Sequence, residues 1–159
     1  MLPLKKILAT TDFSEAALDG LKVANELAAH FSAELVAIHV IPPLPITTVP
    51  GVAAPVAPAG FNIPSYQQEL EASARKSLEE TVNNIFSNDL RIKQVVAHGP
   101  AASEIVQVAD SEAVDVIVIS SHGQTGWRRI MFGSVAEKVV QLSNRPVLAI
   151  PVERKKEKE

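Results

Sequence analysis

Two short polar segments carry residue types that suit the binding of a phosphorylated ligand. Thr10–Asp12 follows an aliphatic run, and Ser120–Gly123 follows another. Nine residues separate Gly123 from Gly133, and Ser134 comes next. Glycine lets a backbone approach a ligand closely, and a helix that starts near Ser134 offers free N–H groups and a positive dipole end to an anion. This spacing predicts a phosphate-binding cradle.

Two of these residues also have purely structural interpretations. Ser134 and Glu137 match a capping box, which explains Ser134 without any ligand. Asp12 can cap the helix that follows it, although a carboxylate also suits ribose hydroxyls as an acceptor. The segment is not a P-loop, because no Gly-Lys-Ser/Thr occurs in it. The residues alone leave both interpretations open.

No side chains in these segments form a convincing nucleophile and base. His122 is the one group nearby that titrates close to neutral pH, but a turn residue bonded by backbone groups fits its position better. Arg128 and Arg129 are typical of a solvated segment, and Trp127 of one that packs a loop. His39 lies inside an aliphatic run, which favours a satisfied histidine near the core. We therefore predict no catalytic residues, and at most a slow ATPase.

The two polar segments can meet only if the fold brings the ends of their strands together. Short aliphatic runs predict five strands, at residues 5–9, 34–41, 91–97, 114–120 and 146–152. Helical spacing of apolar residues predicts four intervening helices, with starts near Ser14, Ser65, Pro100 and Ser134. This alternation favours a single-domain α/β fold, a doubly wound five-stranded parallel sheet with helices on both faces. Ligands bind such sheets at the carboxyl ends of the strands, where the winding reverses.

Finer patterns predict how the helices begin, end and pack. Ser14 is the expected N-cap of the first helix, and Ser65 with Gln68 matches a capping box for the second. Asn144 is the expected left-handed cap after the last helix. Apolar spacing turns a further set of residues inward: Tyr66 and Leu70 in the second helix, Ala102, Ile105, Val106 and Ala109 in the third, and Val135, Val139 and Leu142 in the fourth.

Composition excludes several classes of protein. Hydrophobic residues make up 47% and charged residues 21% of the 159 residues, which is typical of a globular domain. Without cysteine there is no disulfide, thiolate metal site or thiol nucleophile. A net charge of −3 gives no basic field for nucleic acid, and no apolar run is long enough for a membrane span. We therefore expect a soluble cytoplasmic protein with no metal site of its own.

One segment breaks all periodicity. Residues 42–64 hold seven of the eleven prolines, which predicts a long loop. It can be a lid beside the ligand or a surface loop held by its own packing. The charged residues 153–159 predict a solvated tail.

The chain resembles the universal stress protein family over residues 1–152. The resemblance is carried by KKILATTDFSE, ELVAIHVIPP and VVAHGPAASEIV, and above all by VDVIVISSHGQTGWRRIMFGSVAEKVVQLSNRPVLAIP. Members that bind ATP carry Gly-x2-Gly-x9-Gly-Ser/Thr. Gly123, Gly133 and Ser134 match the last three positions of that motif, whereas Ser120 stands at the first, which is a departure.

The resemblance implies a strand order of 3-2-1-4-5 and a module that binds ATP, with Mg²⁺ or another divalent cation, in a role in stress response. Asp12 would lie at the ribose and Val40 against the adenine. The implied site comprises Thr10, Thr11, Asp12, Val40, Ile119, Ser120, Gly123, Gly133, Ser134 and Val135. The resemblance also implies a homodimer through the last strand, at Val147, Leu148, Ala149 and Ile150. The alternatives are a dimeric interaction protein that binds no nucleotide, or a slow ATPase.

Overall fold

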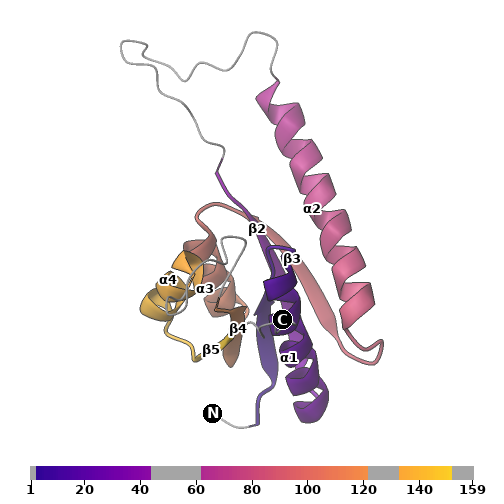
Figure 1. Ribbon diagram of the computed structural model, residues 1–159, viewed down its shortest axis with the longest axis vertical. Coiled ribbons are helices and arrows are strands. Elements are labelled where there is room, and N and C mark those ends of the chain that lie inside the picture. The colour runs from indigo at the N-terminus through magenta and orange to yellow at the C-terminus, as the bar shows by residue number, and fades with distance from the viewer. Residues whose placement is uncertain (1–2, 44–61, 122–132, 152–159) are drawn as a thin grey trace, which may run out of the picture.

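The computed structural model describes residues 3–43, 62–121 and 133–151. Within them, strands and helices alternate in the order β1 Lys6–Thr10, α1 Glu15–Phe31, β2 Glu34–Ile41, α2 Ile63–Ile85, β3 Ile92–His98, α3 Ala101–Ser111, β4 Val116–Ser120, α4 Ser134–Leu142 and β5 Val147–Ile150. Neighbouring strands are parallel, in the order β3-β2-β1-β4-β5. Helices α1 and α2 lie on one side of the sheet, and α3 and α4 on the other (Figure 1). The predicted α/β fold and strand order are confirmed.

The central strand β1 is aliphatic because it meets protein on both faces. Ile7 is in register with Leu35 of β2 and with Val116 of β4. Leu8 faces the opposite side, because side chains alternate along a strand. Both Ile7 and Leu8 are fully buried. Because such a strand has no face in contact with solvent, its sequence is a continuous run of apolar residues.

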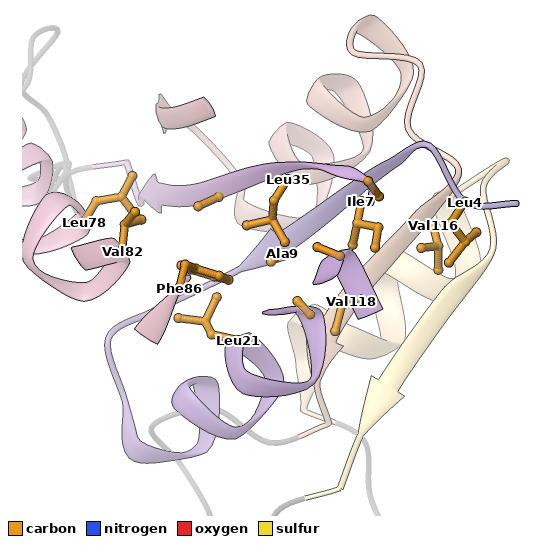
Figure 2. Packing of buried hydrophobic residues seen from close by; sticks show 14 residues of the cluster. Leu4, Ile7, Ala9, Leu21, Leu35, Leu78, Val82, Phe86, Val116 and Val118 are labelled. Atoms are coloured by element: carbon orange, nitrogen blue, oxygen red, sulfur yellow. The ribbon is translucent and has the colours of Figure 1, made fainter. Parts of the chain in front are cut away.

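Two aliphatic clusters hold the layers together. Leu21 of α1 and Leu78 of α2 pack with Ile7 on one face of the sheet, as Figure 2 shows. Ile105 of α3 and Val139 of α4 pack on the other face. Each fully buried side chain of this size stabilises the fold by about 1.5–3 kcal/mol relative to its exposed state. Among the helices of the described residues, none combines the length and apolarity that a membrane span requires.

The start of α2 differs from the prediction. Its N-cap is Asn62, whose side chain accepts a hydrogen bond from the Ser65 amide at 3.2 Å, so the predicted capping box of Ser65 and Gln68 is wrong. Pro64 is accommodated because the first turn of a helix leaves its N–H groups without intrahelical partners. The loop predicted at 42–64 therefore ends at residue 62. Its residues 44–61, and with them the lid hypothesis, lie outside the described part.

Several side chains predicted to face inward are exposed. The first turns of α2 extend beyond the strands, which leaves Tyr66 at the surface (Figure 1). In α4, Val139 is buried as predicted, but Ala136 takes the other inward position, and Val135 and Leu142 are exposed. Apolar spacing alone did not show which side of this short helix meets α3.

Several helices and strands begin or end at residues other than those predicted. The last helix has Ser143 as its C-cap with an extended backbone, so a left-handed Asn144 is wrong. The Ser143 hydroxyl donates to the Arg145 carbonyl at 3.0 Å and accepts from the Arg145 amide at 2.9 Å, which closes the turn without a left-handed residue. Pro100 is the N-cap of α3 rather than part of its first turn. Strand β2 has its predicted ends, whereas the other strands shift by one or two residues.

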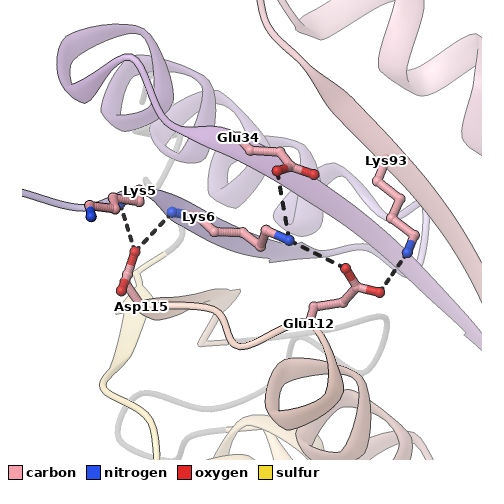
Figure 3. A network of polar contacts seen from close by, with 6 residues as sticks. All are labelled: Lys5, Lys6, Glu34, Lys93, Glu112 and Asp115. Carbon is pink, nitrogen blue, oxygen red and sulfur yellow. Dashed lines mark hydrogen bonds and ion pairs between the residues drawn. The ribbon is translucent and has the colours of Figure 1, made fainter.

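An ion-pair network joins the amino ends of the strands (Figure 3). Lys6 Nζ lies 3.5 Å from Glu112 and 3.6 Å from Glu34. Lys93 Nζ lies 2.6 Å from the same Glu112 carboxylate. The hydrogen bond from Lys93, together with the positive charges of Lys93 and Lys6, lowers the pKa of Glu112 below its ordinary value.

Asp115 fastens the start of β1 to the loop before β4. Its carboxylate accepts the backbone N–H groups of Lys5 at 2.6 Å and Lys6 at 2.9 Å. These two hydrogen bonds favour the ionised form and hold the pKa of Asp115 below its ordinary value of 3.8. A carboxyl group with a lowered pKa in the folded state stabilises the fold above its ordinary pKa. That contribution is lost as the pH falls through the lowered value.

We predict that Asp115→Asn lowers the free energy of unfolding by about 1 kcal/mol at neutral pH, after allowance for solvent screening. The difference from wild type should shrink towards zero as the pH falls through the lowered pKa of Asp115, where its carboxyl group becomes protonated. Urea unfolding at a series of pH values measures both effects. Asp110→Asn is the matched control, because the Asp110 carboxylate forms an exposed pair with Arg145. An offset that does not depend on pH would contradict the assignment.

Candidate functional site

A pocket of about 360 Å³ opens at the carboxyl ends of the central strands. Strands β1, β2 and β4 contribute their last residues, and α3 and α4 contribute their first turns. In the order β3-β2-β1-β4-β5, the winding reverses between β1 and β4, so this is the place where a doubly wound sheet binds ligands. The pocket lies where the sequence predicts a site.

The structure brings the predicted residues from four separate segments together. The predicted residues that line this pocket are Thr10, Thr11, Asp12, Val40, Ile119, Ser120, Gly133, Ser134 and Val135. The tenth, Gly123, lies outside the described residues, as do His122, Trp127, Arg128 and Arg129.

The amino end of α4 forms one wall of the pocket. Gly133 is its N-cap, and the Gly133 N–H donates to the Ser121 carbonyl at 2.6 Å. The Gly133 carbonyl accepts the Glu137 N–H at 3.0 Å. Ser134 is thus the first helical residue and not the cap, so the alternative of a Ser134–Glu137 capping box is wrong. The N–H groups of residues 134–136 have no partner within the helix, and the positive dipole end lies with them.

The loop from β1 to α1 forms the opposite wall. Ser14 caps α1 as predicted, because its side chain accepts the Ala17 N–H at 3.2 Å. Asp12 Oδ1 accepts both the backbone N–H of Ser14, at 3.0 Å, and the Ser14 hydroxyl. Thr11 Oγ1 accepts the Phe13 N–H at 3.0 Å. Asp12 is therefore not the helix cap itself. Asp12 instead holds Ser14, which is the cap, and Asp12 also lines the pocket.

The floor of the pocket is apolar. Val40 and Ile119 belong to the cluster under α3 and α4, together with Ile38 and Ile105. A flat aromatic ring suits such a surface. The sequence reasoning missed several lining residues: Ala17, Ile38, His39, Pro42, Ala101, Ile105 and Ala136. Ile105 had been predicted to face inward, but only the packing of α3 over β2 places it beneath the pocket.

The serine at position 120 faces the α1 side of the sheet. By strand alternation it falls on the face of Val116 and Val118, which pack in the α1 cluster, and not on the face of Ile119. Gly20 of α1 lies directly against it. A Cβ built on Gly20 would lie 3.3 Å from the Ser120 backbone nitrogen. Gly20 thus lets α1 approach the end of β4 closely.

We predict that Gly20→Val lowers the free energy of unfolding by about 1–3 kcal/mol, because its γ-methyl groups must displace the backbone at Ser120. Gly20→Ala is the matched control. Its single Cβ needs a shift of only a few tenths of an ångström, and the gain of about 1 kcal/mol in helix propensity offsets the strain. Denaturant unfolding measures both variants. Equal stability of Val and Ala at this position would contradict the close contact.

A sequence model of the Universal stress protein family matches residues 3–151. The chain belongs to the universal stress protein family. Universal stress protein MJ0577 of Methanocaldococcus jannaschii is 32% identical over 152 residues, which cover 92% of this chain and 94% of that protein. The solved structure of MJ0577 covers 96% of this chain and 99% of its own, with 29% identity and a TM-score of 0.76.

Two further universal stress proteins of known structure share the fold at lower identity. One was solved in complex with cAMP, and is 18% identical with a TM-score of 0.62 over 93% of this chain and 97% of that one. The other, from Archaeoglobus fulgidus, was solved in complex with dAMP. It is 19% identical with a TM-score of 0.55 over 94% of this chain and 99% of that one.

Proposed function

We propose that this universal stress protein is a regulatory module that binds ATP in the pocket between β1 and β4. The observation that carries the proposal is the meeting of polar loop, apolar floor and helix N-terminus in one pocket of about 360 Å³. A volume of this size falls within the range of small-molecule sites. The complexes of two fold relatives with cAMP and dAMP support an adenine nucleotide as the ligand.

Each wall of the pocket suits one part of ATP. The adenine ring would lie against Val40 and Ile119. The Asp12 carboxylate would accept hydrogen bonds from the ribose hydroxyls, and its negative charge would strengthen them. The phosphates would lie at the amino end of α4. Gly133 has no side chain to keep them away, and the N–H groups of the first turn could donate hydrogen bonds to them. Gly123 would complete this cradle.

A divalent cation would be held mainly by the phosphates. The described residues contain no group of three or more histidine or acidic side chains that could hold a metal ion. Mg²⁺ commonly binds through substrate phosphates and water with few protein ligands, so this donor set fits Mg²⁺ that arrives with ATP. Such a cation would neutralise part of the phosphate charge.

Calorimetry with ATP and magnesium tests the proposal. At about 100 times the dissociation constant, bound ATP should add about 2.7 kcal/mol to the free energy of unfolding and raise Tm by roughly 5–10 °C. Mass spectrometry of the supernatant from denatured protein, purified without added nucleotide, should show an adenine nucleotide. No heat and no change in Tm at millimolar ATP would contradict the proposal and favour the interaction protein that binds no nucleotide.

We also propose that the protein forms a homodimer through β5. This strand lies at one edge of the sheet and pairs with β4 on its other side. An aliphatic edge strand with unpaired backbone groups is prone to pair with another chain, and Leu148 is 38% exposed there. Pairing of two β5 strands would give the edge backbone groups hydrogen-bond partners and would bury Leu148.

We predict that Leu148→Lys weakens this dimer at least about tenfold, because the charge would be buried between two copies. Sedimentation of the wild type should give about twice the 17.0 kDa mass of the chain, and that of the variant the monomer mass. Ile63→Lys is the matched control, because Ile63 is equally exposed but starts α2 on the far side of the molecule (Figure 1). A variant that stays dimeric would place the interface elsewhere.

A further inference from the structure

His39 lies behind the loop that presents Asp12. Its Nδ1 is 2.9 Å from the backbone carbonyl oxygen of Thr11. A carbonyl oxygen can only accept, so His39 Nδ1 carries the hydrogen and donates it. The histidine thereby holds the residue immediately before Asp12.

The same ring also holds the residue after Asp12. His39 stacks on Phe13, with ring centroids 4.2 Å apart and planes 27° from parallel. Phe13 has a φ of 63°, in the left-handed region that aromatic residues rarely adopt. Such a backbone persists only where the surrounding structure supports it. A hydrogen bond before Asp12 and a ring stack after it fix the direction in which that carboxylate points.

His39 acts from the face of the sheet opposite the apolar floor. Ile38 and Val40, its neighbours on β2, pack in the cluster under α3 and α4. Ala37, two residues away, packs in the cluster under α1 and α2, where Phe13 also lies. Alternation places the His39 ring on this second face. Through this face His39 contacts the β1–α1 loop. His39 also lines the pocket, so a comparison of ligands with and without ribose hydroxyls is needed to separate an effect through the loop from direct contact.

We propose that His39 is a positioning residue that sets the Asp12 carboxylate for the ribose hydroxyls. This inference rests on the proposed ATP site. It names the ribose hydroxyls as the part of ATP whose binding depends on His39. A ligand without ribose hydroxyls gains nothing from Asp12, so it should not sense His39. A general structural role would weaken both kinds of ligand equally.

The test compares ATP with 2′,3′-dideoxy-ATP in matched variants. His39→Phe keeps a ring to stack on Phe13 and removes the donor, whereas His39→Asn keeps a donor near Nδ1 and removes the ring. His39→Phe should weaken ATP about tenfold and dideoxy-ATP less than about twofold. His39→Asn should stay within about threefold of wild type for ATP. His98→Phe should change neither, because His98 ends the neighbouring strand and does not line the pocket.

Amide hydrogen exchange of the ligand-free protein provides a second measurement. The Phe13 and Ser14 amides donate to Thr11 Oγ1 and Asp12 Oδ1. Their exchange should become at least about threefold faster in His39→Phe, with the core strands unchanged. Equal losses for the two ligands, or unchanged exchange at both amides, would overturn the role of His39. Failure of the wild type to bind ATP at all would instead overturn the proposed function, and the exchange result would still decide whether His39 holds the loop.

Discussion

Gly133→Val is expected to lower the affinity for ATP by at least about a hundredfold, below detection in most calorimetric experiments. Gly133 caps α4 where the phosphates would approach the N–H groups of the first turn. A branched side chain there would keep the phosphates away from these donors, and hydrogen bonds to a charged group contribute about 1.5–3 kcal/mol each. Titration with ATP and magnesium measures the loss.

The fold should survive this substitution. Gly133 has φ −57° and ψ 147°, which any residue can adopt. Alanine and valine are both poor N-caps, so Gly133→Ala matches the expected loss of helix stability and differs only in size. We expect similar Tm values for the two variants, but a loss of ATP affinity of only about tenfold for alanine. Wild-type affinity in the valine variant would show that no phosphate lies at this helix end.

The fold was predictable wherever a segment has one dominant local signal. The run ELVAIHVI has apolar residues on both faces and is followed by Pro42 and Pro43, and β2 has its predicted ends. The start of α2 was not predictable, because Asn62 and Ser65 are both good caps and Pro64 is tolerated beside either. The inward face of α4 was also missed, since contact with α3 and not apolar spacing selects Ala136 over Val135.

The residues of the candidate site also fall into those that the sequence predicts and those that it does not. Asp12, Gly133 and Ser134 were predictable as pocket residues because they follow a strand or precede a helix at the carboxyl edge of a parallel sheet, where ligands bind. Ile105 and His39 were not, because their places depend on how α3 and the β1–α1 loop pack against β2. The sequence indicated that His39 is satisfied near the core, and the structure confirms this by its hydrogen bond to Thr11. The sequence did not show that this hydrogen bond holds the loop that lines the candidate site.

The ion-pair network and the candidate site lie at opposite ends of the central strand β1. Lys6, at the start of β1, belongs to the ion-pair network, whereas Thr10, at its end, lines the pocket. Substitutions such as Asp115→Asn should therefore change stability with little effect on ATP affinity. Sites so far apart, with no shared partner, usually act independently.

Asp12→Asn is expected to weaken ATP by about 10- to 100-fold while leaving the fold nearly unchanged. The asparagine keeps an oxygen that can accept the Ser14 N–H, so the start of α1 stays braced. It loses the negative charge that would strengthen hydrogen bonds from the ribose hydroxyls, a difference of about 1.5–3 kcal/mol. Calorimetry with ATP and with 2′,3′-dideoxy-ATP measures the effect, and only ATP should respond.

The sign of this effect separates hydrogen bonding from long-range electrostatics. Removing a negative charge near a triphosphate would strengthen binding if only the field mattered. Asp19→Asn removes the same charge from the exposed surface of α1, where Asp19 pairs with Lys22, and should leave ATP affinity unchanged or slightly raised. A loss of affinity for ATP but not for 2′,3′-dideoxy-ATP in Asp12→Asn, with no loss in Asp19→Asn, would come from contact of Asp12 with the ribose hydroxyls. Wild-type affinity in Asp12→Asn would reduce the role of Asp12 to bracing Ser14.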